Sequence, residues 1–202
     1  MTTALLQTTY FGPVQWYQKL NRYDHCVIEQ HDTYQKQTYK NRCVIATANG
    51  LQALTVPVEV SSNREEVKDV RISDHNNWRK VHWHALQSAY SESPFFDYYV
   101  DDIRPFFEKK YAFLIDFNEA IRQKICELVD IRPSVEYSLK FRVQSLELRD
   151  FREVIHAKHP QEDAEFEARP YWQVFQHRYG FQPNLSILDL LFCMGPESVF
   201  YL

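Results

Sequence analysis

The sequence contains little glycine, and this scarcity limits the ways in which the chain could bind phosphate. Only four of its 202 residues are glycine, and none of the motifs G-x-x-x-x-G-K-[S/T], G-x-G-x-x-G or G-x-S-x-G occurs. Four glycines cannot form a glycine-rich loop around phosphate groups. Phosphate could still bind at the N-terminus of a helix, assisted by Lys or Arg. The turns at Gly12-Pro13 and at residues 183–186 precede two predicted helices and are the candidates.

Long apolar runs and closely spaced cysteines are also lacking. No run approaches the roughly 18 apolar residues of a membrane helix, and the N-terminal residues do not have the pattern of a signal peptide. Cys26, Cys43, Cys126 and Cys193 lie far apart within apolar segments. This is typical of reduced, buried thiols rather than disulfides or a zinc site. We expect a soluble cytoplasmic protein without membrane insertion.

No excess of positive charge is present. The formal net charge is −4 and the pI is near 6.1, so we expect no stable nucleic-acid binding. Basic surface would have to be local, at Lys36, Lys40 and Arg42. Aromatic residues make up 15% of the chain, which favours an ordered core over disorder. We expect one domain spanning residues 1–202.

The first 30 residues predict a βαβ unit. Residues 4–11 resemble a strand, Gly12-Pro13 a turn, residues 17–20 part of a helix, and residues 25–30 a second apolar strand. In such units ligands bind beyond the carboxyl ends of the strands. The predicted class is therefore α/β, a single domain with a small mixed sheet and covering helices, with α+β as the alternative.

The other predicted elements follow from periodicity and turn residues. Residues 43–48 and 51–60 predict a β-hairpin with a type I′ turn at Asn49-Gly50 and a bend at Pro57. Apolar spacing predicts helices over residues 78–90 and 113–129, and another after Ser93 as its N-cap that breaks near Pro105. Further expectations are strands at residues 68–72 and 135–139, an exposed loop at residues 156–168, and a capping box of Ser186 and Asp189 before a short helix.

Polar side chains without an evident structural role are concentrated at residues 10–19, 30–42 and 183–195. The middle stretch has no apolar periodicity, so we interpret it as a binding loop between two strands. Tyr34, Lys36, Asn41 and Arg42 suit a hydroxylated or anionic ligand, because Arg offers a bidentate fork and Tyr a ring with a hydroxyl tip. Alternatively, Asn41 caps a turn and Arg42 pairs with an acid.

Outside this loop, the structural explanation competes closely with a functional one. Tyr10 could line a pocket, but aromatic residues at such spacing are more often part of the core. Asn184, Ser186 and Asp189 are more simply capping residues, although an Asp189 that faced a cleft could act as a base. His82 falls on an apolar helical stripe and is better explained as a buried, hydrogen-bonded side chain. We expect neither a metal nor a cofactor.

Six segments stand out in order along nearly the whole chain: Thr9-Tyr10-Phe11-Gly12-Pro13, Tyr34-x-Lys36 with Asn41-Arg42, Leu54-Thr55-Val56-Pro57-Val58, Trp78-Arg79-Lys80, Ser93-Pro94-Phe95-Phe96, and Pro183-Asn184-Leu185-Ser186-Ile187-Leu188-Asp189-Leu190-Leu191-Phe192. Together they resemble the WbqC-like family of bacterial proteins, the last segment being the most specific. Similar members occur among genes for O-antigen and other surface polysaccharides. The resemblance therefore implies an enzyme of this biosynthesis that transfers an aminoacyl or acyl group to a nucleotide-linked amino sugar.

The chain departs from the family pattern at two places. Longer members begin with a segment like His-Gln-Pro-Asn-Tyr-Phe-Pro, where this chain has Leu6-Gln7-Thr8-Thr9. They also carry a glycine-containing segment late in the chain, whereas residues 156–170 contain no glycine. Both differences argue against nucleotide activation by those motifs.

Two interpretations of function remain open, besides a weaker one of a tRNA-related activity. In the enzymatic one, a small-molecule substrate of the nucleotide-sugar class binds, and His31 or Asp189 transfers a proton. The substrate-binding candidates are Tyr10, Tyr34, Lys36, Asn41, Arg42, Asn184 and Ser186. The alternative is a non-catalytic domain that binds a ligand or a protein, since no nucleophile–base pair can be named. Convergence of Tyr10, the loop and Asn184 on one concave pocket would favour the enzyme.

Overall fold

The main sheet is parallel, and the antiparallel strands form separate pairs. The computed structural model describes residues 2–60, 62, 64–139 and 148–202. Its largest sheet has the spatial order β7 (Val135–Tyr137), β2 (His25–Glu29), β1 (Thr3–Gln7) and β8 (Leu148–Asp150). The antiparallel pairs are β3 (Arg42–Thr47) with β4 (Gly50–Thr55) and β5 (Val58–Glu59) with β6 (Arg71–Ile72). The α/β class is confirmed, but the expected mixed sheet is divided among three sheets in the described residues.

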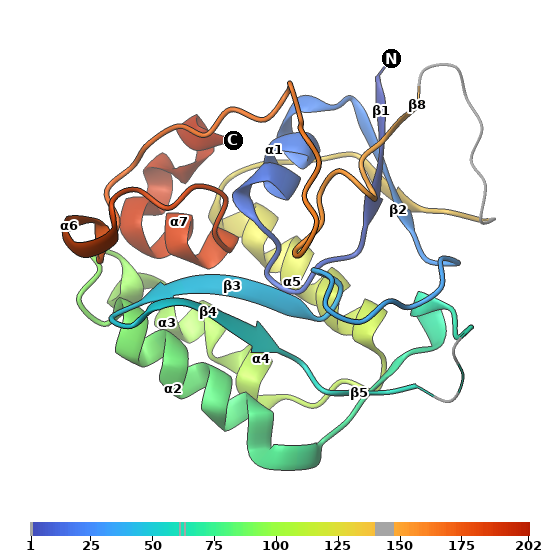
Figure 1. Cartoon of the computed structure of the whole chain (residues 1–202), viewed down its shortest axis with the longest axis horizontal. Coiled ribbons are helices and arrows are strands. Elements are labelled where there is room, and N and C mark those ends of the chain that lie inside the picture. The colour runs from blue at the N-terminus through green and yellow to red at the C-terminus, as the bar shows by residue number, and fades with distance from the viewer. Residues whose placement is uncertain (1, 61, 63, 140–147) are drawn as a thin grey trace.

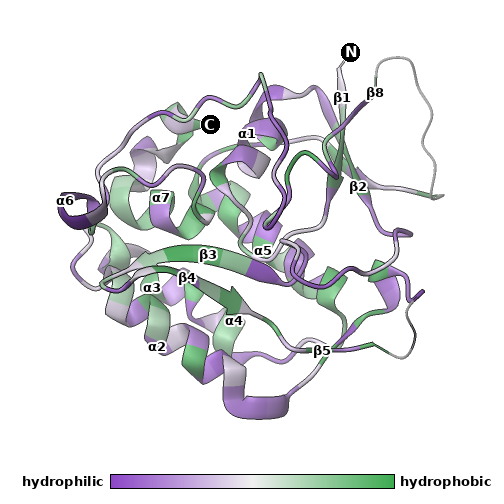
Figure 2. Cartoon of the chain, in the orientation of Figure 1, coloured by the Kyte–Doolittle hydropathy of each residue, from purple (hydrophilic) through white to green (hydrophobic). Residues whose placement is uncertain are grey.

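Helices cover the sheet and both sides of the hairpin. They are α1 (Val14–Arg22), α2 (Trp78–Tyr90), α3 (Phe96–Ile103), α4 (Pro105–Glu108), α5 (Leu114–Leu128), α6 (Gln176–Tyr179) and α7 (Ile187–Met194), with 3-10 turns η1 (Val67–Asp69), η2 (His75–Asn77) and η3 (Gly195–Tyr201). The β3–β4 hairpin lies between α7 and α2, with α6 at the periphery (Figure 1). The hydropathy of these helices differs accordingly: α7, beside the hairpin, is mostly hydrophobic, and α6, at the periphery, is hydrophilic (Figure 2). None of the described helices is long and apolar enough to cross a membrane.

The N-terminal βαβ unit is confirmed, with a shorter first strand than predicted. β1 and β2 are parallel, with Leu5 opposite Val27. The strand ends at Gln7 rather than continuing to Phe11, because Phe11 has a φ of 41°, which a strand cannot accommodate. Pro13 then takes the extended N-cap conformation and α1 begins at the next residue.

The hairpin is confirmed, but its turn is shifted by one residue. Thr47 pairs with Gly50, so Ala48 and Asn49 form the two-residue loop. Only Gly50 of this turn has a positive φ, 101°, and a type I′ turn would require positive φ at both loop residues. Ala48 carries a Cβ that disfavours that conformation. The bend at Pro57 is present, because β4 ends before it and β5 begins after it.

One predicted helix cap and one predicted capping box differ from the structure. Ser93 does not cap α3; its hydroxyl donates to the Tyr90 carbonyl, and α3 begins at Phe96 without a side-chain cap. Ser186 does cap α7, since its Oγ accepts from the Leu188 N–H. Asp189 does not complete a capping box, because its carboxylate accepts hydrogen bonds in the core instead. The predicted helices over residues 78–90 and 113–129 are present as α2 and α5.

Candidate functional site

The carboxyl ends of the four parallel strands gather polar side chains at one edge of the main sheet. We call Gln7, Glu29, His31, Ser138 and Arg152 the carboxyl edge. The Gln7 amide donates to the Arg152 carbonyl at 2.6 Å, joining the ends of β1 and β8. The Ser138 hydroxyl donates to the Glu29 carboxylate at 2.8 Å, joining the ends of β7 and β2. Parallel pairing thus places these groups where α/β proteins bind ligands.

Glu29 is a buried carboxylate with one oxygen left available. The residue is 1% exposed. Its Oε1 accepts hydrogen bonds from the His31 N–H at 2.6 Å and from Ser138. Its Oε2 accepts no hydrogen bond from any residue that the structure describes; the Arg152 Nη1 lies 3.9 Å away. Because buried polar atoms are normally hydrogen-bonded, Oε2 is suited to a donor on a bound ligand.

The predicted catalytic residue His31 lies at this edge. Its Nδ1 is 2.9 Å from Glu66 Oε2, and Lys68 Nζ is 2.8 Å from the same oxygen. The hydrogen bonds from Lys68 and His31 lower the pKa of Glu66, so this carboxylate is charged near neutral pH. The His31 side chain keeps 21% exposure. Its imidazole is therefore partly accessible to a ligand at this edge.

The predicted binding loop, residues 30–42, follows β2 and begins at the same edge. Lys40 is fully buried and its Nζ lies 2.9 Å from Asp32 Oδ2, which makes it a structural cation. Lys36 is exposed, whereas Tyr34 is 9% exposed. The Arg42 Nε donates to Thr55 Oγ1 at 3.1 Å across the hairpin rather than to an acid. Among the loop's cations, the Lys36 side chain is therefore the most accessible to a ligand.

Three other predicted binding side chains form hydrogen bonds within the fold, although Asn41 Oδ1 accepts none from the described residues. The Tyr10 hydroxyl is 2.9 Å from His82 Nδ1, Asn41 Nδ2 donates to the Val56 carbonyl at 2.7 Å, and Ser186 Oγ donates to the Phe11 carbonyl at 2.8 Å. Tyr10, Asn41 and Ser186 are each at most 3% exposed. These contacts support the structural explanation for Tyr10 and Ser186.

The three polar stretches do meet, but through their main chains. The Tyr10 N–H donates to the Tyr39 carbonyl, and the Ile187 N–H donates to the Gly12 carbonyl, both at 2.9 Å. Asn184 faces α1 instead: its Oδ1 accepts from the Gln15 N–H and its Nδ2 donates to Gln15 Oε1, each at 2.9 Å. The side chains of Tyr10, Arg42 and Asn184 therefore have different partners and do not form the common pocket that we expected.

Both helix starts proposed for phosphate are occupied by the protein itself. At α1, the Val14 N–H donates to the Leu185 carbonyl and the Gln15 N–H donates to Asn184. At α7, the Ile187 N–H donates to Gly12 and the Leu188 N–H donates to Ser186. With these donors satisfied, neither N-terminus is free to bind an anion.

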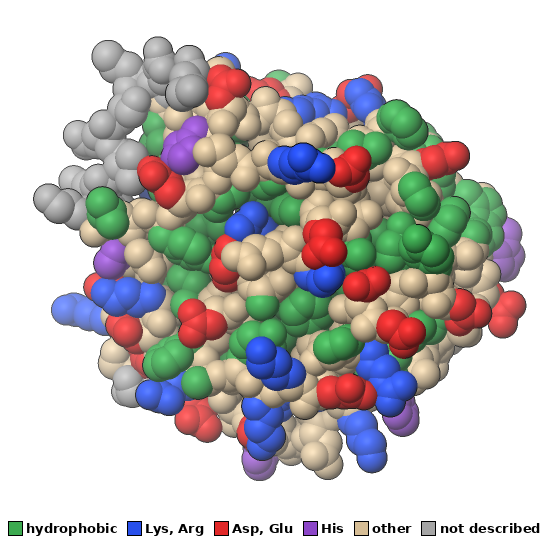
Figure 3. All heavy atoms as spheres, turned by 180° about the vertical axis from the view of Figure 1, so that it is seen from behind, with side chains coloured by type: hydrophobic (Ala, Val, Ile, Leu, Met, Phe, Trp, Pro, Cys, Tyr) green, Lys and Arg blue, Asp and Glu red, His purple; other side chains and the backbone are tan. Residues whose placement is uncertain are grey.

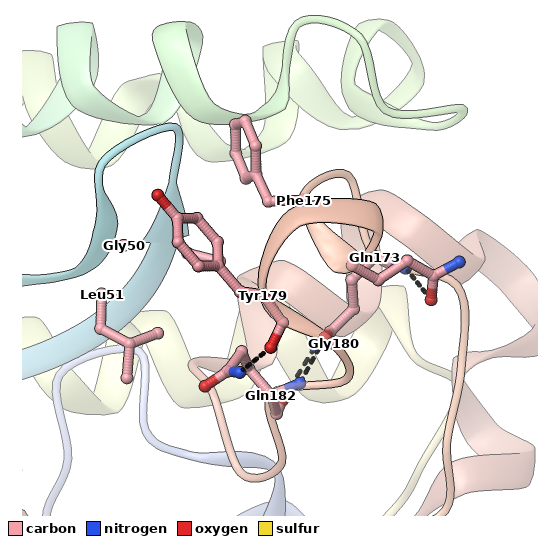
Figure 4. Close-up of a pocket in the computed structure, with 9 residues that line it drawn as sticks. Gly50, Leu51, Gln173, Phe175, Tyr179, Gly180 and Gln182 are labelled. Atoms are coloured by element: carbon pink, nitrogen blue, oxygen red, sulfur yellow. Dashed lines mark hydrogen bonds between the residues drawn. The ribbon is translucent and has the colours of Figure 1, made fainter.

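Asp189 does not face a cleft, the condition on which its proposed catalytic role depended. It is 1% exposed and accepts from the Tyr90 hydroxyl at 2.9 Å, the Tyr171 hydroxyl at 2.7 Å and Gln173 Nε2 at 2.9 Å. Burial raises its pKa, opposed by the hydrogen bonds from Tyr171, Tyr90 and Gln173. Its hydrogen-bond partner Gln173 lines a cavity near α6 (Figure 4).

Comparison with known proteins decides the family. A model of the WbqC-like protein family matches residues 7–164. The chain belongs to this family. Over 225 aligned positions it is 26% identical to "Uncharacterized protein Rv1507c" of Mycobacterium tuberculosis, covering 98% of this chain and 96% of the relative. No solved structure is significantly similar to it.

The matched range of this WbqC-like protein contains the whole carboxyl edge, from Gln7 to Arg152, and excludes Asp189. Sequence reasoning missed Glu29 and Arg152. Glu29 had a recognisable signal, because it is a charged residue at the end of the apolar run Cys26-Val27-Ile28. No sequence signal marked Arg152, because it follows β8, a strand of three residues that lacks a clear alternating pattern.

Proposed function

We propose that this WbqC-like protein transfers an acyl or aminoacyl group to the amino group of a nucleotide-linked sugar, in surface-polysaccharide biosynthesis. The observation that carries the proposal is the available Oε2 of the buried Glu29 carboxylate at the carboxyl edge. A carboxylate in this position accepts a hydrogen bond from a substrate amine and can take its proton. The family resemblance supplies the class of substrate.

In the proposed reaction the amine nitrogen attacks the carbonyl carbon of an activated acyl donor. The new C–N bond forms, the bond from the carbonyl carbon to the donor's leaving group breaks, and Glu29 accepts the proton that nitrogen loses. His31, two residues further along the chain and partly exposed, passes this proton to solvent or to the leaving group. Holding the amine against the acyl carbon would supply the proximity that catalysis requires.

Two cations, of which Arg152 lies near Glu29, suit the phosphates of such a substrate. Arg152 approaches from the end of β8 and Lys36 is accessible on the loop. We propose that these two cations face the phosphates of the nucleotide, and that Tyr34 and Arg42 border the sugar. Arg152 donates from Nε and Nη2 to the Asp150 carboxylate, so a phosphate would compete with Asp150 for the planar fork of this guanidinium.

Binding to a nucleotide-linked amino sugar, measured by isothermal titration calorimetry, tests the proposal. The same compound with its amine acetylated serves as the ligand control. Glu29→Gln should weaken binding of the free amine by about tenfold, because an uncharged amide replaces the carboxylate, and should leave the acetylated compound unaffected. Glu153→Gln, at an exposed glutamate near the same edge, should change neither. Equal binding of both compounds to wild type and Glu29→Gln would refute the role of Glu29.

A non-catalytic ligand-binding domain is the second candidate. It is favoured by the number of predicted site residues whose polar groups are used structurally, namely Tyr10, Asn41, Ser186 and Asp189. Single-turnover assays with aminoacyl adenylates and acyl thioesters separate the two candidates. Tight binding of the amino sugar without product from either donor class would favour the binding domain.

A further inference from the structure

A small cavity lies between α6 and the turn of the β3–β4 hairpin; Ala46, Gly50 and Leu51 of its lining lie inside the range that matches the family, and its other lining residues, at 173–182, lie beyond that range. Its volume is about 240 Å³. Tyr179 extends from α6 toward the hairpin, with Leu51 on the same side and Gln173 on the far side (Figure 4). The hairpin turn is held against α6, since the Tyr179 hydroxyl and Arg178 Nη1 both donate to the Ala48 carbonyl.

The size and lining of the cavity restrict the class of ligand. Sites for drug-sized ligands begin at roughly 300 Å³, so this cavity suits a single ring system. Phe175, Tyr179 and Leu51 supply apolar and aromatic surface, and none of the described residues that line the cavity has a charged side chain. A charged group inside would lose its hydration without gaining a partner. The ligand group in the cavity is therefore uncharged.

Three glutamine amides supply the polar groups of the lining. The Gln173 amide is already used, because it donates to Asp189 and to the Gln182 carbonyl and accepts from the Gln182 N–H. Gln182 Nε2 donates to the Tyr179 carbonyl, and Gln176 Oε1 accepts from the Gln173 N–H. Within the described part of the chain, Gln176 Nε2 and Gln182 Oε1 have no partner. They offer a ligand one donor and one acceptor.

We infer that this cavity binds an uncharged nitrogen heterocycle of the nucleobase class. A flat ring can stack on an aromatic side chain, and the edge of a base pairs a donor with an acceptor as glutamine amides do. His177 and Arg178 are exposed on α6 beside the cavity, where the phosphate of a nucleotide would find a cation. The inference is independent of the proposed transfer reaction, whose residues lie at the carboxyl edge.

Binding of the four ribonucleosides, measured by saturation-transfer NMR and calorimetry, tests the inference. At least one nucleoside should bind, whereas glucose and indole, which lack either the flat ring or the paired donor and acceptor, should bind at least about tenfold more weakly. The corresponding monophosphate should bind more tightly than its nucleoside if Arg178 faces the phosphate. Glu29→Gln should leave nucleoside binding unchanged, which keeps this test separate from that of the transfer reaction.

Matched variants locate the site. Tyr179→Ala should weaken nucleoside binding by about tenfold through loss of stacking, whereas Tyr179→Phe keeps the ring and should stay within about twofold. Trp172→Ala removes an aromatic ring that is 45% exposed and does not line the cavity, and should also stay within about twofold. Failure of all four nucleosides to bind, equal binding of glucose or indole, or unchanged binding by Tyr179→Ala would overturn the inference.

Discussion

The hydroxyl of Tyr10 lies 2.9 Å from the Nδ1 of His82, and both side chains are buried in the core. Their rings are 5.8 Å apart, and Trp78 packs edge-on against His82 at 5.1 Å. Burial lowers the pKa of His82 from 6.5 to about 4, while a hydrogen bond with the Thr55 backbone acts in the opposite direction. His82 is therefore neutral in the folded protein at pH 7.

This buried histidine should make the protein acid-sensitive. Between pH 6.5 and about 4 the unfolded chain binds a proton at His82 that the folded chain does not. Its contribution to stability is therefore fully present above pH 6.5 and is lost as the pH falls through this window, by about 3 kcal/mol in all. Urea unfolding at several pH values should show a steeper fall for wild type than for His82→Gln. Parallel curves would contradict a neutral His82.

Tyr10→Phe distinguishes a structural tyrosine from a ligand-binding one. Loss of the hydroxyl should lower the free energy of unfolding by about 1 kcal/mol, because His82 Nδ1 loses its buried partner. Binding of the amino sugar should be unchanged, since the Tyr10 hydroxyl is already hydrogen-bonded to His82 in the core. Calorimetric titration of the variant, well below its melting temperature, measures this directly. A loss of binding without a loss of stability would show that Tyr10 contacts the ligand.

A buried ion pair joins Lys19 of α1 to Asp163, in the segment that follows β8. Lys19 Nζ lies 2.8 Å from Asp163 Oδ2, with side chains 1% and 5% exposed. Asp163→Ala should destabilise the protein by about 3 kcal/mol, because it leaves the ammonium group buried with only the more distant Glu165. Lys19→Met should cost less, because it removes the charge itself. Glu162→Ala, at an exposed neighbour, is the control; an equal effect of all three would refute the ion pair's role.

Asp189→Asn tests whether this buried carboxylate is structural. Its oxygens accept from Tyr90, Tyr171 and Gln173, so an amide N–H in place of one oxygen would face a donor. We expect a loss of about 2 kcal/mol in the free energy of unfolding, with turnover per folded molecule unchanged. Thermal unfolding and single-turnover assays on the same sample measure both. Asp97→Asn, at an exposed aspartate on α3, is the control. An inactive but fully stable variant would show that Asp189 is catalytic.

One face of the molecule carries charges of both signs. On the rear face, Lys and Arg side chains are interspersed with Asp and Glu (Figure 3). Charges of opposite sign at such close spacing largely cancel at long range. Recognition of an anionic ligand would therefore depend on local groups such as Lys36 and Arg152.

Local signals in the sequence predicted the elements that form from neighbouring residues. Apolar spacing defined α2 and α5, and the two apolar runs around Asn49-Gly50 defined the hairpin, although not its turn type. The Ser186 cap also follows from its own segment. Each of these depends on contacts between residues a few positions apart, where propensity and periodicity act.

Tertiary structure decided the neighbours of β1, the partners of Tyr10 and Asp189, and the composition of the carboxyl edge. Gln7 and Arg152 meet across 145 positions, and Glu29 and Ser138 across 109. No local propensity encodes such a pairing, because it arises only when parallel strands align and bury their faces together. The sequence by itself determined that Glu29 ends an apolar strand. Only the folded chain left one of its carboxylate oxygens without a hydrogen-bond donor from the described residues.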